Sequence, residues 1–134
     1  VTRKNSAESD LNNWVPYIVV LTAWTVERAS VDFWRPFIDL LLKKGAVYFA
    51  CIGTFSEKLH DEIDEFLYQY EDSLGEYIHI NIVTTYHKND TIEEAVDYCI
   101  YGTDIRDRTH NCILVVLDSD SIEDKEAERF FLKV

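Results

Sequence analysis

Two aspartates, Asp118 and Asp120, follow directly after the apolar run 112–117. A short apolar run that ends abruptly in polar residues is typical of a strand buried on both faces of a parallel sheet. Open α/β sheets bind their ligands where such strands end. Two neighbouring carboxylates have the ligand chemistry of a hard divalent cation, usually Mg²⁺ with several waters and a phosphate oxygen. The pair is therefore the first candidate site in the chain.

The pattern Asp118-x-Asp120 resembles the acidic pair that follows a strand in Toprim phosphotransfer domains. The resemblance implies a Mg²⁺-dependent domain that handles phosphate groups or nucleotides. Toprim domains also carry a glutamate at the end of their first strand, where this chain has Thr22 and Ala23. Glu27, in the loop that follows, is then the nearest third ligand. The competing interpretation is structural, because aspartates at such a place also cap helices and turn loops.

Other catalytic patterns are weaker. Phosphate-binding loops need glycines, but none lies between Leu21 and Trp34, and neither GxGxxG nor GxxxxGK[ST] occurs. A thiol–imidazole pair of Cys51 and His87 is conceivable, yet the apolar neighbours of Cys51 predict an inert core thiol. The sequence therefore predicts no catalytic residues.

A second candidate is an acidic binding surface on segment 57–76, which holds eight acidic residues and one basic residue. The whole chain has 25 acidic and 13 basic residues, a formal net charge of −12. Such a field attracts a basic protein and repels the phosphate backbone of nucleic acids, although it also serves ordinary solubility. The residues predicted to contact a partner are Asp61, Glu62, Asp64, Glu65 and Asp72, with Trp24 as an aromatic anchor.

The leading hypothesis is a non-catalytic acidic protein, of the binding or inhibitory (immunity) type, that engages a basic protein partner without a cofactor. The alternative is the Toprim-like, Mg²⁺-dependent domain with Asp118, Asp120 and Glu27 as metal ligands.

The elements that would position these residues alternate along the chain. Strands are predicted at 17–21, 47–52, 77–86 and 112–117, and helices at 32–44, 56–74, 91–102 and 121–134. Asp32 and Ser56 are predicted to cap the first two helices. Thr91–Glu94 has the spacing of a capping box, and Ser121–Asp124 has the spacing of another helix start.

This alternation predicts a single three-layer, Rossmann-like α/β domain with four mostly parallel strands and four helices. The third strand alternates polar and apolar residues, which is typical of a sheet edge. The strand order 3-2-1-4 is therefore favoured over 2-1-3-4. In that order the topological switch lies between strands one and four, so the loop Thr22–Glu27 is expected beside Asp118 and Asp120.

Residues 1–13 are polar and lack periodicity, so they are expected to form a flexible tail before one domain at 14–134. No apolar run approaches the roughly 18 residues that a membrane span requires. The first ten residues also lack the apolar segment of a secretory signal. Three widely spaced cysteines in apolar segments predict buried thiols and a cytoplasmic location.

Overall fold

A computed structural model of the chain describes residues 2–3, 18–43, 48–73, 82–102, 113–118 and 120–133. Its strands are β1 (Thr2–Arg3), β2 (Ile18–Thr22), β3 (Tyr48–Ile52), β4 (Val83–His87) and β5 (Ile113–Leu117). Its helices are the 3₁₀ turn η2 (Glu27–Ala29), α2 (Val31–Lys43), α3 (Ser56–Ser73), α4 (Ile92–Asp97) with its π-helical continuation η3 (Tyr98–Gly102), and α5 (Ile122–Leu132). No helix within these residues is long and apolar enough to cross a membrane.

The strands form one parallel sheet in the order β1-β5-β2-β3-β4. The predicted order 3-2-1-4 is confirmed, since strands one to four of the prediction are β2, β3, β4 and β5. The short strand β1 was not predicted, because two residues are too few to show a periodicity. It pairs Thr2 with Val116 and Arg3 with Leu117 at the open edge of β5, within the segment expected to be a tail. Residues 4–17 lie outside the described residues.

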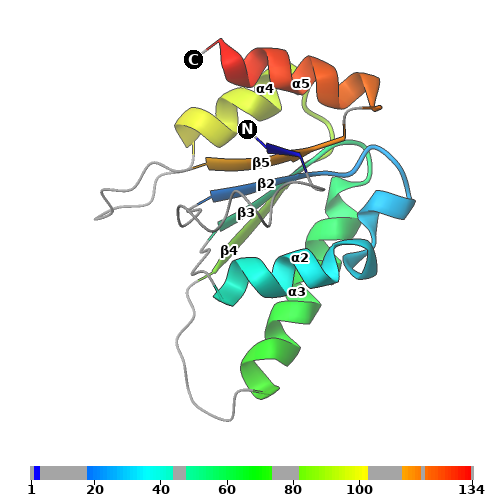
Figure 1. Ribbon diagram of the computed structural model, residues 1–134, viewed down its shortest axis with the longest axis vertical. Helices are drawn as coiled ribbons and strands as arrows, with labels where there is room; N and C mark the ends of the chain where they lie inside the picture. Colours follow the sequence, from blue (N-terminus) through cyan, green and yellow to red (C-terminus); the bar gives the residue numbers. More distant parts are fainter. Residues whose placement is uncertain are drawn as a thin grey trace.

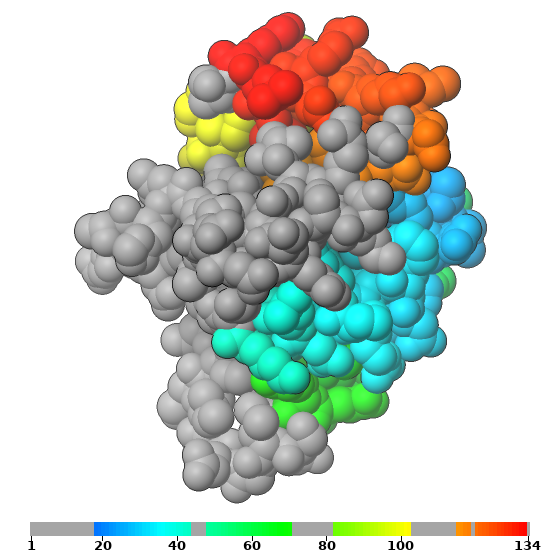
Figure 2. All heavy atoms as spheres, viewed as in Figure 1, coloured from blue at the N-terminus to red at the C-terminus, as the bar shows by residue number. Residues whose placement is uncertain are grey.

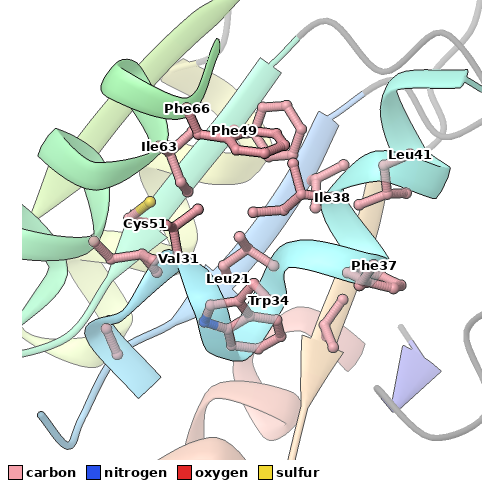
Figure 3. Packing of buried hydrophobic residues seen from close by; sticks show 14 of the residues in the cluster. Leu21, Val31, Trp34, Phe37, Ile38, Leu41, Phe49, Cys51, Ile63 and Phe66 are labelled. Atoms are coloured by element: carbon pink, nitrogen blue, oxygen red, sulfur yellow. The ribbon is translucent and has the colours of Figure 1, made fainter. Parts of the chain in front are cut away.

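Two helical layers cover the sheet, α2 and α3 on one face and α4 and α5 on the other (Figure 1). The central strands are almost entirely apolar, because successive side chains point to opposite faces and both faces are buried. In β2, Val19 and Leu21 pack with α2 and α3, whereas Ile18 and Val20 pack with α4 and α5. The larger cluster includes Trp34, Phe49 and the other side chains drawn in Figure 3.

The edge strand β4 is half exposed, as its polar alternation predicted. Val83 and Tyr86 are 46% and 41% exposed, whereas every residue of β2 and β3 is buried. The predicted strand 77–86 is confirmed from Val83 onward, and residues 77–81 lie outside the described part of the chain.

Two of the predicted helix caps are wrong. The first helix begins at Val31, so Ser30 and not Asp32 stands before it, and the Asp32 N–H donates to Ser30 Oγ at 3.3 Å. Ser56 is the first residue of α3, and its buried hydroxyl has no hydrogen-bond partner among the described residues. The capping box at Thr91–Glu94 and the cap Ser121 are both confirmed. Sequence spacing identified the helices but left their first residue uncertain by one or two positions.

Gly53 allows the turn after β3 to approach the loop after β2. Its φ is +117°, and a Cβ at this position would lie 2.7 Å from the carbonyl oxygen of Ala23. That close approach accompanies two backbone hydrogen bonds, from the Ala23 N–H to Ile52 O at 2.8 Å and from the Phe55 N–H to Ala23 O at 2.9 Å. The start of the loop after β2 is therefore fixed by its neighbour in the sheet.

Candidate functional site

A pocket of about 460 Å³ lies at the carboxyl ends of β2 and β5. These neighbouring strands lead into helices on opposite faces of the sheet, so the pocket marks the topological switch point predicted from the sequence. In Figure 2 the loop after β2, in blue, lies directly beside the start of α5, in orange. The residues that line the pocket are Trp24, Thr25, Glu27, Arg28, Phe33, Asp118, Asp120, Ser121, Ile122 and Glu123.

Asp124, a carboxylate that is 1% exposed, holds together several of the segments around the pocket. It accepts hydrogen bonds from Trp24 Nε1 at 2.6 Å, Arg28 Nη1 at 2.8 Å, Thr22 Oγ1 at 3.2 Å and the backbone N–H of Asp118 at 2.6 Å. One side chain of α5 thus ties together the ends of β2 and β5 and the loop between β2 and α2. Buried carboxylates persist in proteins when their charge and lone pairs are satisfied in this way.

Arg28 is the cationic partner of Asp124 and is itself 7% exposed. Its guanidinium carbon lies 5.2 Å from the ring centroid of Trp34 and 6.0 Å from that of Phe33. The indole N–H of Trp34 donates to the carbonyl oxygen of Arg28 at 2.7 Å, which fixes the backbone of η2. The buried Nε of Arg28 has no hydrogen-bond partner among the described residues. The charge of Arg28 is therefore balanced within the protein, while one of its donors is unused.

Asp118 and Asp120 lie at the exposed rim of the pocket. The backbone N–H of Asp120 donates to Asp118 Oδ1 at 2.9 Å, and the Ser121 N–H donates to Asp118 O at 3.2 Å. Asp118 therefore turns the loop, whereas the helix cap is Ser121, whose Oγ accepts from the Asp124 N–H at 3.2 Å. One carboxylate oxygen of Asp118 thus takes part in the turn, and neither Asp118 nor Asp120 is the cap of α5.

Glu27 lines the same pocket as the two aspartates, as the strand order predicted. Within the part of the chain that the structure describes, however, no three His, Cys, Asp or Glu side chains are grouped closely enough to hold a metal ion. The predicted three-carboxylate Mg²⁺ site is thus not formed there. Mg²⁺ binding through Asp118 and Asp120 alone, with water and a phosphate oxygen, stays a prediction from the sequence.

Trp24 was predicted to be an exposed anchor, but it is half buried. Its ring packs against the core beneath α4 and α5, and its N–H is committed to Asp124. The side chain still lines the pocket. Its hydrogen-bond donor is thus already used within the protein.

The predicted acidic face of α3 is formed in part. Asp61, Asp64 and Glu65 are exposed, and Asp72 lies in the helix at a position whose side chain the structure does not describe. Glu62 is different, since its Oε1 accepts the backbone N–H of Val31 at 3.0 Å and its other oxygen pairs with Lys58. Glu62 therefore holds the start of α2 and is not a free surface charge, which corrects its predicted role.

Glu62 should give the protein a measurable pH dependence. Burial raises its pKa, but the hydrogen bond and charge of Lys58 and the Val31 N–H outweigh burial, so the pKa lies below the ordinary glutamate value. A depressed pKa adds stability above the unfolded-state pKa, and this stability is lost as pH falls through the folded-state value. We expect Glu62→Gln to cost about 1 kcal/mol at pH 7, reduced by the partial exposure of the carboxylate. Urea titrations from pH 7 to pH 3 should show the two proteins converging in acid, and a constant difference would contradict this role.

A second pocket, of about 550 Å³, lies at the carboxyl ends of β3 and β4. It is lined by Thr54, Phe55, Glu57, Lys58, Asp61, Glu62, Glu65 and Lys88. Lys88 forms an ion pair with Glu57 at 2.5 Å, and Lys58 pairs with Glu62. Both lysines are thus paired with carboxylates of the chain itself.

The thiol–imidazole pair of Cys51 and His87 is not formed. Cys51 is fully buried under α2 and α3, and burial raises the pKa of its thiol. His87 pairs in register with Ile52, whose side chain packs in the core on the other face of the sheet, beneath α4 and α5. The ring of His87 lies beside that of Tyr98, with 4.2 Å between the two centroids. Cys99 is also buried, which raises its pKa to about 12, and Cys112 lies outside the described residues. Both described thiols therefore match the predicted inert core cysteines.

Sequence reasoning missed the two residues that organise the pocket. Asp124 was interpreted as the third residue of a helix start, which it is, but its side chain points into the protein. Arg28 had no signal beyond being a single base in the hydroxyl-rich loop after β2. The useful signal was the position of Asp124 on the same face of α5 as Ala127 and Phe131, because an acid on the buried face of a helix requires a buried base.

The parallel sheet and its helical crossovers define a three-layer α/β domain, and a pocket lies at its switch point. The chain belongs to the family described as Domain of unknown function (DUF7684), whose model matches residues 3–133. No curated protein and no solved structure matches the chain.

Proposed function

We propose that this domain is a non-catalytic binding protein that engages a basic protein partner across the carboxyl ends of its strands. The observation that carries the proposal is how charge is distributed between the two pockets there. Each base that lines them, namely Arg28, Lys58 and Lys88, is paired with a carboxylate of the chain itself. The remaining carboxylates are left to face solvent.

The switch-point pocket supports this proposal most strongly. Glu27, Asp118, Asp120 and Glu123 line it, and within the described residues none of these four forms an ion pair with a base. Rings of Trp24 and Phe33 line the same pocket. Carboxylates beside aromatic rings favour a guanidinium or ammonium group, through charge-assisted hydrogen bonds and cation–π contact.

The second pocket extends the same surface. Its Asp61 and Glu65 have no lysine or arginine partner in the described residues, and Asp61 contacts His60 instead. Residues that follow β2, β3, β4 and β5 line one pocket or the other. Because the carboxyl ends of parallel strands meet at one edge of a sheet, the unpaired acids belong to one end of the molecule. A basic partner would be steered to that end, and a phosphate backbone would be repelled from it.

Capture of a partner from the native host tests this proposal, using a variant whose carboxylates are neutralised. We expect wild type to retain a basic protein, and Glu27→Gln/Asp118→Asn/Asp120→Asn to reduce its association rate about tenfold at low salt. The control is Asp97→Asn/Glu126→Gln, which removes two exposed acids from α4 and α5 away from the pockets. A captured partner that is acidic, or equal loss in the control, would contradict the proposal.

A further inference from the structure

The two edges of the sheet differ in how they are closed. At one edge β1 pairs with the end of β5, where Thr2 lies opposite Val116 and Arg3 lies opposite Leu117. At the other edge β4 pairs only with β3 (Figure 1), and in the described part of the chain its backbone makes no further hydrogen bond. The backbone groups of alternate residues in a strand point to opposite sides, so β4 presents a row of unpaired donors and acceptors at this edge.

β4 has none of the sequence features that usually prevent pairing at an exposed edge. From Val83 to His87 it contains no proline, glycine, lysine, arginine or carboxylate, and its five residues pair with β3 in one unbroken register, without a bulge. The side chains of Val83 and Tyr86 are exposed there. The lysine that follows, Lys88, forms an ion pair with Glu57 of α3. The edge is therefore suited to a further strand.

Helix α3 lies along this edge on one face of the sheet. Asp64 accepts a hydrogen bond from the Thr84 hydroxyl, and the ring of His60 meets that of Tyr86 edge to face, with 4.9 Å between the centroids. Residues four positions apart share one side of a helix, so Tyr68 continues the row of His60 and Asp64 by one turn. Tyr68 is exposed. A strand added to β4 would therefore lie beside this row of α3.

The chemistry of the two faces indicates which strand would fit. Asp61, one turn before Asp64, and Asp64 itself are exposed, and neither has a lysine or arginine partner among the described residues. Carboxylates near tyrosine rings favour a basic side chain, through charge and cation–π contact. Val83 points to the other face, where it offers an apolar contact. Because successive side chains of a strand point to opposite faces, alternating basic and apolar residues would match both.

We propose that β4 receives an extended segment of the basic partner as a further strand of the sheet. Basic side chains of that segment lie over α3, and apolar side chains lie on the face of Val83. The requirement for basic residues rests on the proposed function, whereas the pairing of backbones does not. β4 leads into the second pocket, which Lys88 and Asp61 line, so the added strand adjoins the surface proposed for the partner.

A second copy of this chain fits the edge less well than a basic strand. Two-fold pairing of β4 with itself would bring the acidic sides of two α3 helices together at the same edge. The formal net charge of −12 on each copy adds to that repulsion.

Peptide binding followed by hydrogen exchange tests the inference. The probe is a short peptide of alternating lysine and valine. One control peptide has every backbone nitrogen methylated, which keeps the charges but prevents pairing as a strand, and the other has glutamate in place of lysine. We expect each change to weaken binding about tenfold or more. In the complex with the probe, the β4 amides that face away from β3 should exchange more slowly, and those of β2, which is paired on both sides, should be unchanged.

A charge variant of α3 locates the basic side chains. We expect Asp61→Asn/Asp64→Asn to weaken binding of the lysine–valine peptide about fivefold, while asparagine keeps an acceptor for Thr84. The control is Asp97→Asn/Glu126→Gln, which removes the same number of charges from α4 and α5. Equal weakening by the two double variants would overturn the placement of the basic residues over α3.

The inference is overturned if the methylated peptide binds as well as the unmethylated one, or if no peptide binds. It is also overturned if the β4 amides become protected when the protein alone is concentrated, because a second copy would then occupy the edge. In each case the proposed function still stands when the captured basic protein associates more slowly with Glu27→Gln/Asp118→Asn/Asp120→Asn. Conversely, a captured protein that protects the β4 amides but is insensitive to that variant would support the strand site and contradict the switch-point surface.

Discussion

Replacement of Asp124 by alanine is expected to lower the free energy of unfolding by about 3–5 kcal/mol. The substitution removes the partner of Arg28, which is 7% exposed and would keep an uncompensated charge. It also leaves the Trp24 indole N–H and the Asp118 backbone N–H without their acceptor. Urea unfolding followed by tryptophan fluorescence and circular dichroism measures the loss.

Two control variants separate the charge of Asp124 from its place at the start of α5. Ser121→Ala removes the helix cap but keeps the carboxylate, so we expect it to cost about 1 kcal/mol. Asp124→Asn keeps the shape and an acceptor oxygen but not the charge, so its cost should fall between those of the other two. If Asp124→Ala cost no more than Ser121→Ala, the carboxylate would not be holding the loops together.

The second large effect is expected at Trp34, where replacement by alanine should cost about 3–5 kcal/mol. The side chain is fully buried, belongs to the core cluster drawn in Figure 3 and meets Phe33 edge to face, with 5.0 Å between the ring centroids. Its loss leaves a cavity that the surrounding side chains cannot fill completely. Because its N–H also holds the carbonyl of Arg28, the pocket should lose its shape as well.

Trp34→Phe is the matched control for this prediction. It keeps an aromatic ring in the core but loses volume and the hydrogen bond to Arg28, so we expect it to cost less than half as much as Trp34→Ala. Chemical denaturation compares the stabilities of the two variants. A Trp34→Ala protein within about 1 kcal/mol of wild type would show that the core refills this space.

The sequence was sufficient to predict most of the fold. Buried strands were recognised from continuous apolar runs, and the strand order followed from the polar alternation that places β4 at the edge. Helix starts were less certain, because Ser30 and Asp32 are both good caps and local spacing does not distinguish them. The two-residue strand β1 had no pattern from which to predict it.

The sequence predicted which residues would come together at the switch point, but not how their side chains would pair. Asp118, Asp120, Glu27 and Trp24 do line one pocket, because topology alone fixes which loops meet at the carboxyl ends of β2 and β5. Strand topology does not predict which side chains pair with one another. The bond from Trp24 to Asp124 joins residues 100 positions apart, and neither residue signals the other in the sequence.

The same limitation applies to the acidic helix α3. Periodicity correctly placed Asp61, Asp64 and Glu65 on its exposed side. It could not show that the neighbouring Glu62 accepts the first N–H of α2, because that contact depends on how two helices pack. Glu62 and Glu57 pair with lysines of the chain itself, which reduces the free negative charge of α3. The binding proposal therefore depends mainly on the carboxylates of the switch-point pocket.

The most direct test of this account is the ionic-strength dependence of the association rate between the chain and its captured basic partner. For wild type we predict a rate that falls steeply as salt rises from low to physiological concentration, since exposed charges are screened over about 8–10 Å. The Glu27→Gln/Asp118→Asn/Asp120→Asn variant should show a lower rate at low salt and a clearly shallower dependence. Identical slopes for the two proteins would contradict the claim that the switch-point carboxylates receive the partner.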